Sequence, residues 1–121
     1  MKLDQALSSR IYERAALNRA FEINAFEQIK IGNIKFPAYL SAGQEYISAT
    51  LSVALEEAGI QQRQIFIQHR GHSIYLSFGG NVKKLIDELL GKKTGCSYGM
   101  GGSLGIHSKE IKMFGHDGFM G

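Results

Sequence analysis

The sequence predicts an α/β fold in which a helical N-terminal part precedes the first strand of a sheet. Two patterns predict it: long stretches repeat apolar residues every three or four positions, and one short run, 65–67, holds only strand-forming residues. With 121 residues, the chain is expected to form one domain, 1–121, with a helical lead-in, 1–42, and a second part, 43–121. One strand leaves a parallel sheet incomplete, because its edges need neighbouring strands.

The first predicted helix covers residues 4–30. Its apolar residues recur four positions apart, the spacing that places side chains on one face of a helix. The two series are Leu7, Ile11 and Ala15, followed by Leu17, Phe21 and Ala25. Gly32 and Asn33 are expected to end this helix, and Pro37 prevents it from resuming nearby.

Two more helices are expected downstream. The second runs from about residue 44 to 58, and Gly59 follows it at a capping position that suits a left-handed backbone. Its expected core residues are Ile47, Leu51, Ala54 and Leu55. The third begins after Asn81, whose side chain can accept a hydrogen bond from an exposed amide, and ends at Gly91. Its expected core residues are Val82, Leu85, Ile86 and Leu89, with Asp87 and Glu88 on the other side. The run 65–67, between the second and third helices, is interpreted as a buried strand.

Composition and charge argue against several classes of protein. The net charge is +3, and the basic residues are spread along the chain, so no nucleic-acid partner is expected. No apolar run approaches the roughly 20 residues that span a bilayer, so no membrane partner is expected either. Residues 1–10 lack the apolar core of a secretory signal. The single cysteine, Cys96, cannot form an internal disulfide, which favours a cytoplasmic location.

The segment 69–72, with the sequence HRGH, follows the predicted strand directly. Loops at the carboxyl ends of strands in α/β proteins are where ligands gather. Arg70 offers a planar, permanently charged group that suits phosphate oxygens, and His69 can donate a hydrogen bond to an anion. Gly71 would let a ligand approach the backbone. The alternative is an ordinary exposed loop with one arginine and two histidines.

Glycine is concentrated at the end of the sequence, where nine of the fifteen glycines fall between residues 91 and 121. This density disfavours helix and strand, so the stretch is either a flexible tail or a binding loop that passes close to a ligand. It lacks the Lys-Ser/Thr ending of a phosphate-binding P-loop. No protein-built metal site is predicted, because the histidines lack the spacing and cysteine partners typical of zinc sites. Cys96 is expected to be a small buried or half-buried side chain.

Three sequence strings occur together in a specific order: AGQEYISATLSVAL, then IFIQHRGHSIYLSFGGNVKKLIDELLGKKTGCSYGMGGSLGIH, then FGHDGFMG. In these strings the chain, from about Ala15 onward, resembles the N-terminal portion of the alpha subunit of the thiamine-diphosphate-dependent 2-oxo acid dehydrogenase (decarboxylating) component. Pyruvate, branched-chain 2-oxo acid and acetoin dehydrogenases form this family. The resemblance implies a thiamine-diphosphate-binding fold, with residues 43–121 as its cofactor-binding part.

The same resemblance implies a thiamine diphosphate site shared between an alpha and a beta subunit. His69 and Arg70 match the pair that contacts the cofactor's diphosphate. Gly118, Phe119 and Met120 match the segment whose backbone contacts the aminopyrimidine ring. His72 matches a position close to the active-site channel, and it is the candidate catalytic residue.

Departures from the family pattern bear on substrate and turnover. Tyr39 stands where many members carry a substrate-facing histidine before the GQE motif, and Gly105 stands where the histidine of the family's GGSMH string is expected. The sequence reaches Gly121 before the family's Mg²⁺-binding GDG motif. The Mg²⁺ ligands are therefore expected from another chain or from a missing C-terminal part, because the diphosphate needs this counter-charge. A split gene product, a truncated chain and a cleaved piece all fit this expectation.

The predicted function is a part in the oxidative decarboxylation of a 2-oxo acid, with acyl transfer to a lipoyl group. The chain is expected to be an enzyme part that is inactive without partner chains. The expected partners are a chain carrying the rest of the alpha subunit, a beta subunit and a lipoyl acyltransferase. Two alternatives remain open: a non-catalytic remnant that serves as an interaction module, and a subunit of a thiamine-dependent, acyloin-forming carboligase.

Overall fold

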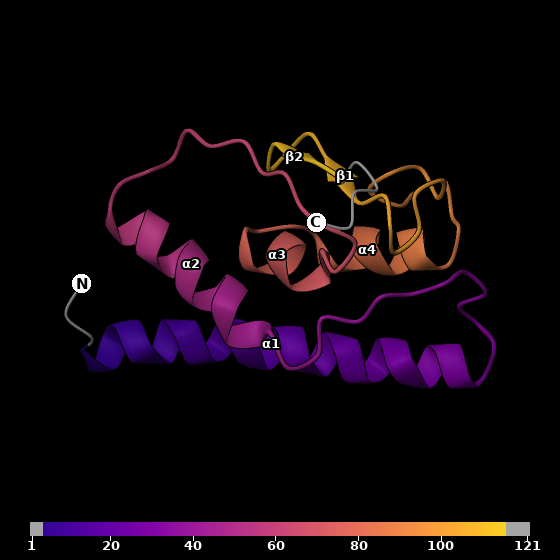
Figure 1. Ribbon diagram of the computed structural model, residues 1–121, viewed down its shortest axis with the longest axis horizontal. Helices are drawn as coiled ribbons and strands as arrows, with labels where there is room; N and C mark the ends of the chain where they lie inside the picture. The colour runs from indigo at the N-terminus through magenta and orange to yellow at the C-terminus, as the bar shows by residue number, and fades with distance from the viewer. Residues whose placement is uncertain (1–3, 116–121) are drawn as a thin grey trace.

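The structure is a computed structural model, and it describes residues 4–115. In this part of the chain the elements follow in the order α1 (Gln5–Lys30), α2 (Glu45–Glu57), α3 (His72–Ser77), α4 (Val82–Leu89), β1 (His107–Ser108) and β2 (Met113–Phe114). The long α1 forms the base, α2 crosses one half of it, and α3, α4 and the β1–β2 hairpin lie over the other half (Figure 1). The described part is therefore mostly helical, with a two-stranded antiparallel sheet, and is compatible with a portion of an α/β fold.

Helix α1 confirms the first predicted helix, and its N-terminus is capped by Asp4, whose carboxylate accepts a hydrogen bond from the Leu7 amide at 2.8 Å. The prediction for Leu17 was wrong, because this side chain is 44% exposed. The buried stripe consists of Leu7, Ile11, Ala15, Asn18, Glu22 and Ala25, with Phe21 beside it. Successive members of this stripe are three or four residues apart, so two polar residues share the buried face with apolar ones.

Helix α2 confirms the extent of the second predicted helix, and Gly59 follows with a left-handed φ of 70°. Its buried face was predicted wrongly. Ile47 is 67% and Leu51 46% exposed, while the buried residues are Glu45, Ser48, Ala49, Ser52 and Val53. The two serines can be buried because each hydroxyl donates a hydrogen bond to a carbonyl three residues earlier in the helix.

The predicted buried strand at 65–67 forms only in part. Ile65 makes an isolated parallel bridge to Met113, and the Ile67 amide donates a hydrogen bond to the Gly115 carbonyl at 3.0 Å. Phe66 is 74% exposed and stacks on Phe114. The segment thus pairs along one edge with β2, and because side chains alternate along an extended backbone, only Ile65 and Ile67 turn inward, both half-buried.

Helix α4 confirms the third predicted helix, with the Asn81 side chain accepting from the Lys84 amide at 3.0 Å and Gly91 ending the helix at a φ of 69°. Leu85 and Leu89 are buried as predicted, but Val82 is 37% and Ile86 43% exposed. The placement of Asp87 and Glu88 was also wrong, because both are buried. Each finds partners in the loop that follows α4: Thr94 and Lys92 for Asp87, and backbone amides for Glu88. Helix α3, a single turn and a half, was not predicted.

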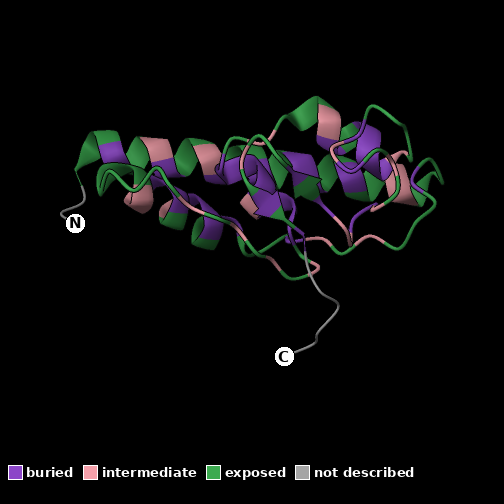
Figure 2. Ribbon diagram, turned by 90° about the horizontal axis from the view of Figure 1, so that it is seen from above, coloured by how far each residue is buried: buried purple, intermediate pink, exposed green. Residues whose placement is uncertain are grey.

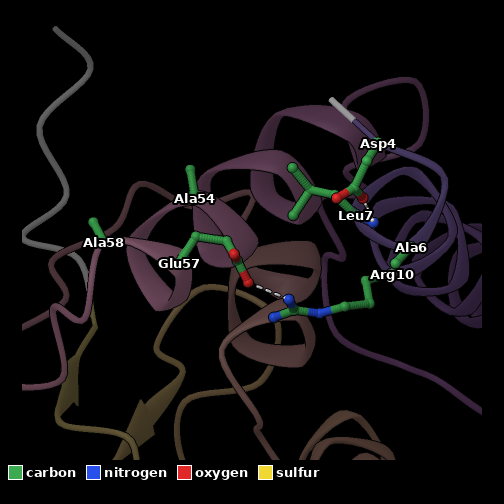
Figure 3. A pocket seen from close by; sticks show the side chains of 7 residues that line it. All are labelled: Asp4, Ala6, Leu7, Arg10, Ala54, Glu57 and Ala58. Atoms are coloured by element: carbon green, nitrogen blue, oxygen red, sulfur yellow. Dashed lines mark hydrogen bonds and ion pairs between the residues drawn. The ribbon is translucent and has the colours of Figure 1, made fainter. Parts of the chain in front are cut away.

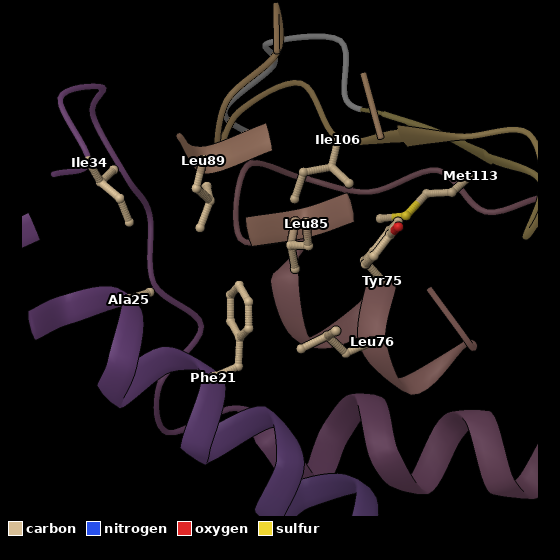
Figure 4. Packing of buried hydrophobic residues seen from close by; sticks show 9 residues of the cluster. All are labelled: Phe21, Ala25, Ile34, Tyr75, Leu76, Leu85, Leu89, Ile106 and Met113. Carbon is tan, nitrogen blue, oxygen red and sulfur yellow. The ribbon is translucent and has the colours of Figure 1, made fainter. Parts of the chain in front are cut away.

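The buried apolar residues form two clusters, one at each half of α1. Buried positions recur along α1 and in the helices that lie beside it (Figure 2). The smaller joins α1 to α2 through Leu7, Ile11, Ala15, Ala49 and Val53. The larger joins α1 to α3, α4 and β2, and it consists of Phe21, Ala25, Ile34, Tyr75, Leu76, Leu85, Leu89, Ile106 and Met113 (Figure 4). This second cluster supports the 65–72 segment from below, since Ile65 and Ile67 pack against it.

Ion pairs reinforce the seam between α1 and α2. Arg10 pairs with Glu57, beside a shallow pocket between the two helices (Figure 3), and with Glu56 at 2.9 Å. Arg14 pairs with Glu56 at 2.7 Å. Exposed pairs of this kind contribute about 0–1 kcal/mol each, so the apolar contacts beneath them dominate the seam. In the stretch 4–115, none of the helices combines the length and apolar character needed to cross a bilayer.

Candidate functional site

The 69–72 loop leaves the extended segment beside β2 and runs directly into α3. Arg70 is exposed and His69 is half-buried, whereas Gly71 and His72 are buried. A Cβ atom on Gly71 would lie 2.1 Å from Cδ1 of Ile67. The missing side chain of Gly71 therefore makes room for Ile67, where the sequence had suggested room for a ligand. The side chain that the loop presents to solvent is Arg70.

Tyr39 lies against the first residue of this loop. Its ring meets the His69 ring edge-on, with centroids 4.8 Å apart and planes at 75°. The Tyr39 amide donates a hydrogen bond to Oγ of Ser103 at 2.9 Å. The residue that stands in place of the expected histidine is thus in contact with the predicted diphosphate loop.

His72 is completely buried, and both of its ring nitrogens have partners. Nδ1 lies 3.1 and 3.2 Å from the two carboxylate oxygens of Glu22, and Nε2 lies 2.9 Å from Oγ of Ser103. The Phe21 ring packs edge-on against the imidazole at 5.6 Å. All these groups are satisfied when Nδ1–H donates to Glu22 and Nε2 accepts from the Ser103 hydroxyl. The geometry fixes the orientation of the ring, and the catalytic role of His72 remains a prediction.

Glu22 carries a carboxylate into the centre of the described part. The amide and hydroxyl of Ser41 both donate to Oε1, at 3.1 and 2.5 Å, in addition to the contact with His72. The Ser41 hydroxyl lies 2.6 Å from that of Ser73. Burial raises the pKa of Glu22, but the hydrogen bonds from His72 and Ser41 outweigh it, so the pKa is lowered. The cluster ties α1, the 41–45 turn and α3 together.

The glycine-rich stretch is a folded loop in residues 91–105, so the flexible-tail alternative was wrong there. It folds around the buried carboxylate of Glu88. Four backbone amides donate to this carboxylate, and they belong to Ser97, Gly99, Gly101 and Gly102 at 2.7, 2.9, 2.8 and 3.0 Å. Ser97 also fixes the far side of the loop, because its hydroxyl donates to the Gly105 carbonyl at 2.7 Å.

Other candidate residues have simpler outcomes. Gly118, Phe119 and Met120, the predicted pyrimidine-contacting segment, lie outside the described residues, as does His116. Within residues 4–115, no group of three or more His, Cys, Asp or Glu side chains could hold a metal ion. Cys96 is half-buried, as predicted, and burial together with the charge of Glu88 raises the pKa of its thiol to about 11.

The sequence analysis missed Glu22, Ser103 and Glu88 as parts of the site. Glu22 left a visible signal, since it lies seven residues after Ala15 on the same face as the apolar series. Ser103 lies in the glycine-rich string, where the departure at Gly105 drew attention instead. Glu88 left no signal, because its partners are backbone amides of a loop.

Comparison with known proteins gives the class to which the chain is related. No family model matches the sequence. Curated proteins do match it over nearly its whole length, and they confirm the resemblance to alpha subunits of a 2-oxo acid dehydrogenase E1 component. The particular relatives are pyruvate dehydrogenase E1 component alpha subunits.

Three of these relatives show the extent of the match. The mitochondrial subunit alpha-1 of Arabidopsis thaliana is 33% identical over 110 residues, which cover 91% of this chain and 27% of the relative. The alpha subunit of Zymomonas mobilis is 32% identical, covering 91% and 30%, and that of Rhizobium meliloti is 31% identical, covering 93% and 31%. The chain thus spans between a quarter and a third of the length of these relatives.

Proposed function

We propose that the chain forms part of a thiamine-diphosphate-dependent 2-oxo acid dehydrogenase and supplies a share of its diphosphate-binding site. The observation that carries the proposal is the exposed guanidinium of Arg70 beside the half-buried His69, in a chain related to E1 alpha subunits. The loop that bears them rests on the larger apolar cluster and on the buried His72. Support from buried residues keeps the loop that carries the charged group in place, and an arginine on an unsupported surface loop lacks this support.

The residues of the loop fit the diphosphate group of the cofactor. Arginine presents several N–H donors in one plane and can bind two phosphate oxygens at once, and a histidine N–H can serve a third. The described residues offer no cluster for Mg²⁺, so we assign its ligands to polypeptide outside residues 4–115, in another chain or a C-terminal continuation. Gly118, Phe119 and Met120 are proposed to contact the aminopyrimidine ring.

The roles divide between cofactor and protein. Thiamine diphosphate, when bound, supplies carbanion stabilisation for the decarboxylation of a 2-oxo acid. Arg70 offsets the charge of the diphosphate, His69 donates a hydrogen bond to it, and Tyr39 holds the His69 ring. His72 is proposed to act near the substrate channel, with its ring held by Glu22 and Ser103. A beta subunit and a lipoyl acyltransferase are proposed partners, and the lone cysteine supports a cytoplasmic location.

The test uses the complex that co-purifies with the tagged chain and measures thiamine diphosphate affinity by calorimetry in the presence of Mg²⁺. Arg70→Ala is expected to weaken binding by about 1.5–3 kcal/mol, because it removes a charge-assisted hydrogen bond. Lys109→Ala, at an exposed position, is the charge-matched control and is expected to leave the affinity unchanged. An unchanged affinity in Arg70→Ala would rule out the diphosphate role.

The alternative of a non-catalytic interaction module has one observation in its favour. Helix α2 turns Ile47 and Leu51 to solvent, and an apolar groove between α1 and α4 is lined by Leu17 and Ile86. A co-purifying complex that binds no thiamine diphosphate would favour this alternative. A complex that binds the cofactor and converts pyruvate to acyloin, rather than passing electrons to an artificial acceptor, would favour the carboligase.

A further inference from the structure

Glu88 is a fully buried carboxylate at the end of α4 whose partners are not cations. Each of its oxygens accepts hydrogen bonds from two backbone amides. Oε2 accepts from Ser97 and Gly99, and Oε1 accepts from Gly101 and Gly102. Within residues 4–115, no ion pair involves Glu88, so these N–H groups provide its compensation for burial. The four hydrogen bonds hold the carboxylate in place, and they equally hold the backbone of the loop that donates them.

The loop around Glu88 turns sharply and is tightly packed. Tyr98, Gly99 and Gly102 have left-handed φ values of 58°, 74° and 56°. A Cβ atom on Gly99 would lie 2.6 Å from the backbone of Gly91, and one on Gly101 would lie 2.0 Å from the Gly105 carbonyl oxygen. The four amides converge on the carboxylate because glycines allow sharp turns and close backbone contacts in this loop, and only Tyr98 takes a left-handed conformation with a side chain.

The last of these amides lies next to the residue that holds His72. Gly102 is followed by Ser103. The hydroxyl oxygen of Ser103 lies 2.9 Å from Nε2 of His72 and accepts a hydrogen bond from the Tyr39 amide at 2.9 Å. Tyr39 in turn packs on His69. Fixing Gly101 and Gly102 on Glu88 thus fixes Ser103, which contacts His72, the last residue of the 69–72 loop, and Tyr39, which packs on its first residue.

We propose that Glu88 is a positioning residue for the cofactor-binding loop and acts through Ser103 on His72 and Tyr39. This inference rests on the proposed function of His69 and Arg70. The isosteric change Glu88→Gln tests it directly. A glutamine amide has one oxygen that can accept and one NH₂ group that donates, so two of the four loop amides would face a donor.

The experiment measures two quantities in Glu88→Gln, Ser103→Ala and the double variant. The first is thiamine diphosphate affinity of the co-purified complex, with Mg²⁺ present. The second is the ¹⁵N chemical shift of the His72 ring nitrogens, which reports their protonation and hydrogen bonding without any cofactor. Glu13→Gln, at an exposed position of α1, is the charge-matched control.

Glu88→Gln is expected to weaken cofactor binding at least about fivefold and to shift the His72 Nε2 signal, whereas Glu13→Gln changes neither. If Glu88 acts through Ser103, the double variant loses no more affinity than the weaker-binding single variant. Additive losses would overturn the proposed route. If Glu88→Gln does not fold, Ser103→Ala alone decides: an unchanged cofactor affinity and an unchanged His72 signal overturn the proposal.

A failure of the proposed function would look different. In that case Arg70→Ala leaves the affinity unchanged, and the positioning role falls with it. If instead Arg70→Ala weakens binding while Glu88→Gln lowers only the thermal stability, the diphosphate role stands and the positioning role of Glu88 is wrong.

Discussion

The rings of Tyr39 and His69 pack edge-on with their centroids 4.8 Å apart, although the residues are thirty positions apart in the sequence. Tyr39 comes from the irregular segment between α1 and α2, and His69 begins the loop before α3. The segment before the GQE motif thus contacts the loop that is proposed to bind the cofactor. A substitution at Tyr39 should therefore change the properties of the 69–72 loop.

Tyr39→Ala is expected to weaken thiamine diphosphate binding by about 2- to 12-fold. An edge-on aromatic pair contributes about 0.5–1.5 kcal/mol, and its loss removes one of the contacts that orient the His69 ring. Tyr39→Phe keeps the ring and should bind like the unaltered protein. Calorimetry on the co-purified complex measures both. Equal weakening in the two variants would assign the effect to the phenol hydroxyl instead of the ring pair.

The ion pair between Glu45 and Arg19 should make stability depend on pH in the acid range. The Arg19 guanidinium, together with the Gly43 amide, lowers the pKa of Glu45 from 4.5 to about 2. Because the folded-state pKa lies below the unfolded value, the contribution is fully present above about pH 4.5 and is lost as the pH falls toward 2. Urea unfolding followed by circular dichroism should show that Glu45→Gln is less stable than the unaltered chain at pH 6. At pH 2 the difference should be much smaller, and a constant difference would contradict the assignment.

Leu85→Ala is expected to lower the free energy of unfolding by about 2–5 kcal/mol. The side chain is fully buried in the larger apolar cluster, and its removal leaves a cavity. The adjacent residue supplies the control, since Ile86 is 43% exposed. Ile86→Ala should cost about 1 kcal/mol or less. Similar losses in the two variants, measured by urea unfolding, would mean that α4 presents a different face to the core.

Cys96 should react slowly with alkylating reagents in the folded protein. Burial and the nearby Glu88 charge raise the pKa of its thiol to about 11, so the reactive thiolate is on the order of a hundredfold scarcer at pH 8 than in an ordinary thiol. The rate with iodoacetamide should rise to that of a free thiol in denaturant. A fast reaction under native conditions would show that the loop around Glu88 opens readily.

Local pattern predicted where the helices lie better than which faces they bury. The predicted ends of α1, α2 and α4 follow from Gly32, Gly59, Asn81 and Gly91, because caps are local chemistry visible in sequence. The face of α2 does not follow, since the apolar series Ile47 and Leu51 is exposed and Ser48 and Ser52 are buried. Each serine bonds to a carbonyl of its own helix and also to a distant side chain, Asn18 for Ser48 and Arg14 for Ser52, and a periodicity argument does not include such partners.

In the candidate site, too, features set by local sequence could be predicted, and features set by distant partners could not. The 69–72 loop could be predicted as a site because strand formers directly precede a compact cationic string, which is a local signal. The carboxylates that organise its surroundings, Glu22 and Glu88, were not found, since their partners lie 19 to 50 residues away for Glu22 and are loop amides for Glu88. The short α3 was missed because its helix begins within the segment interpreted as a site.

The burial of Glu22 also has a consequence for how the chain acquires its shape during synthesis. Helix α1 leaves the ribosome well before Ser41 and long before His72. The carboxylate of Glu22 must therefore remain hydrated until both partners have emerged. Docking of the C-terminal half of α1 therefore has to wait until the chain has been synthesised as far as His72. A nascent polypeptide halted between residues 45 and 70 would leave Phe21 and Ala25 uncovered beside the hydrated carboxylate of Glu22, and exposed apolar surface of this kind is what chaperones bind.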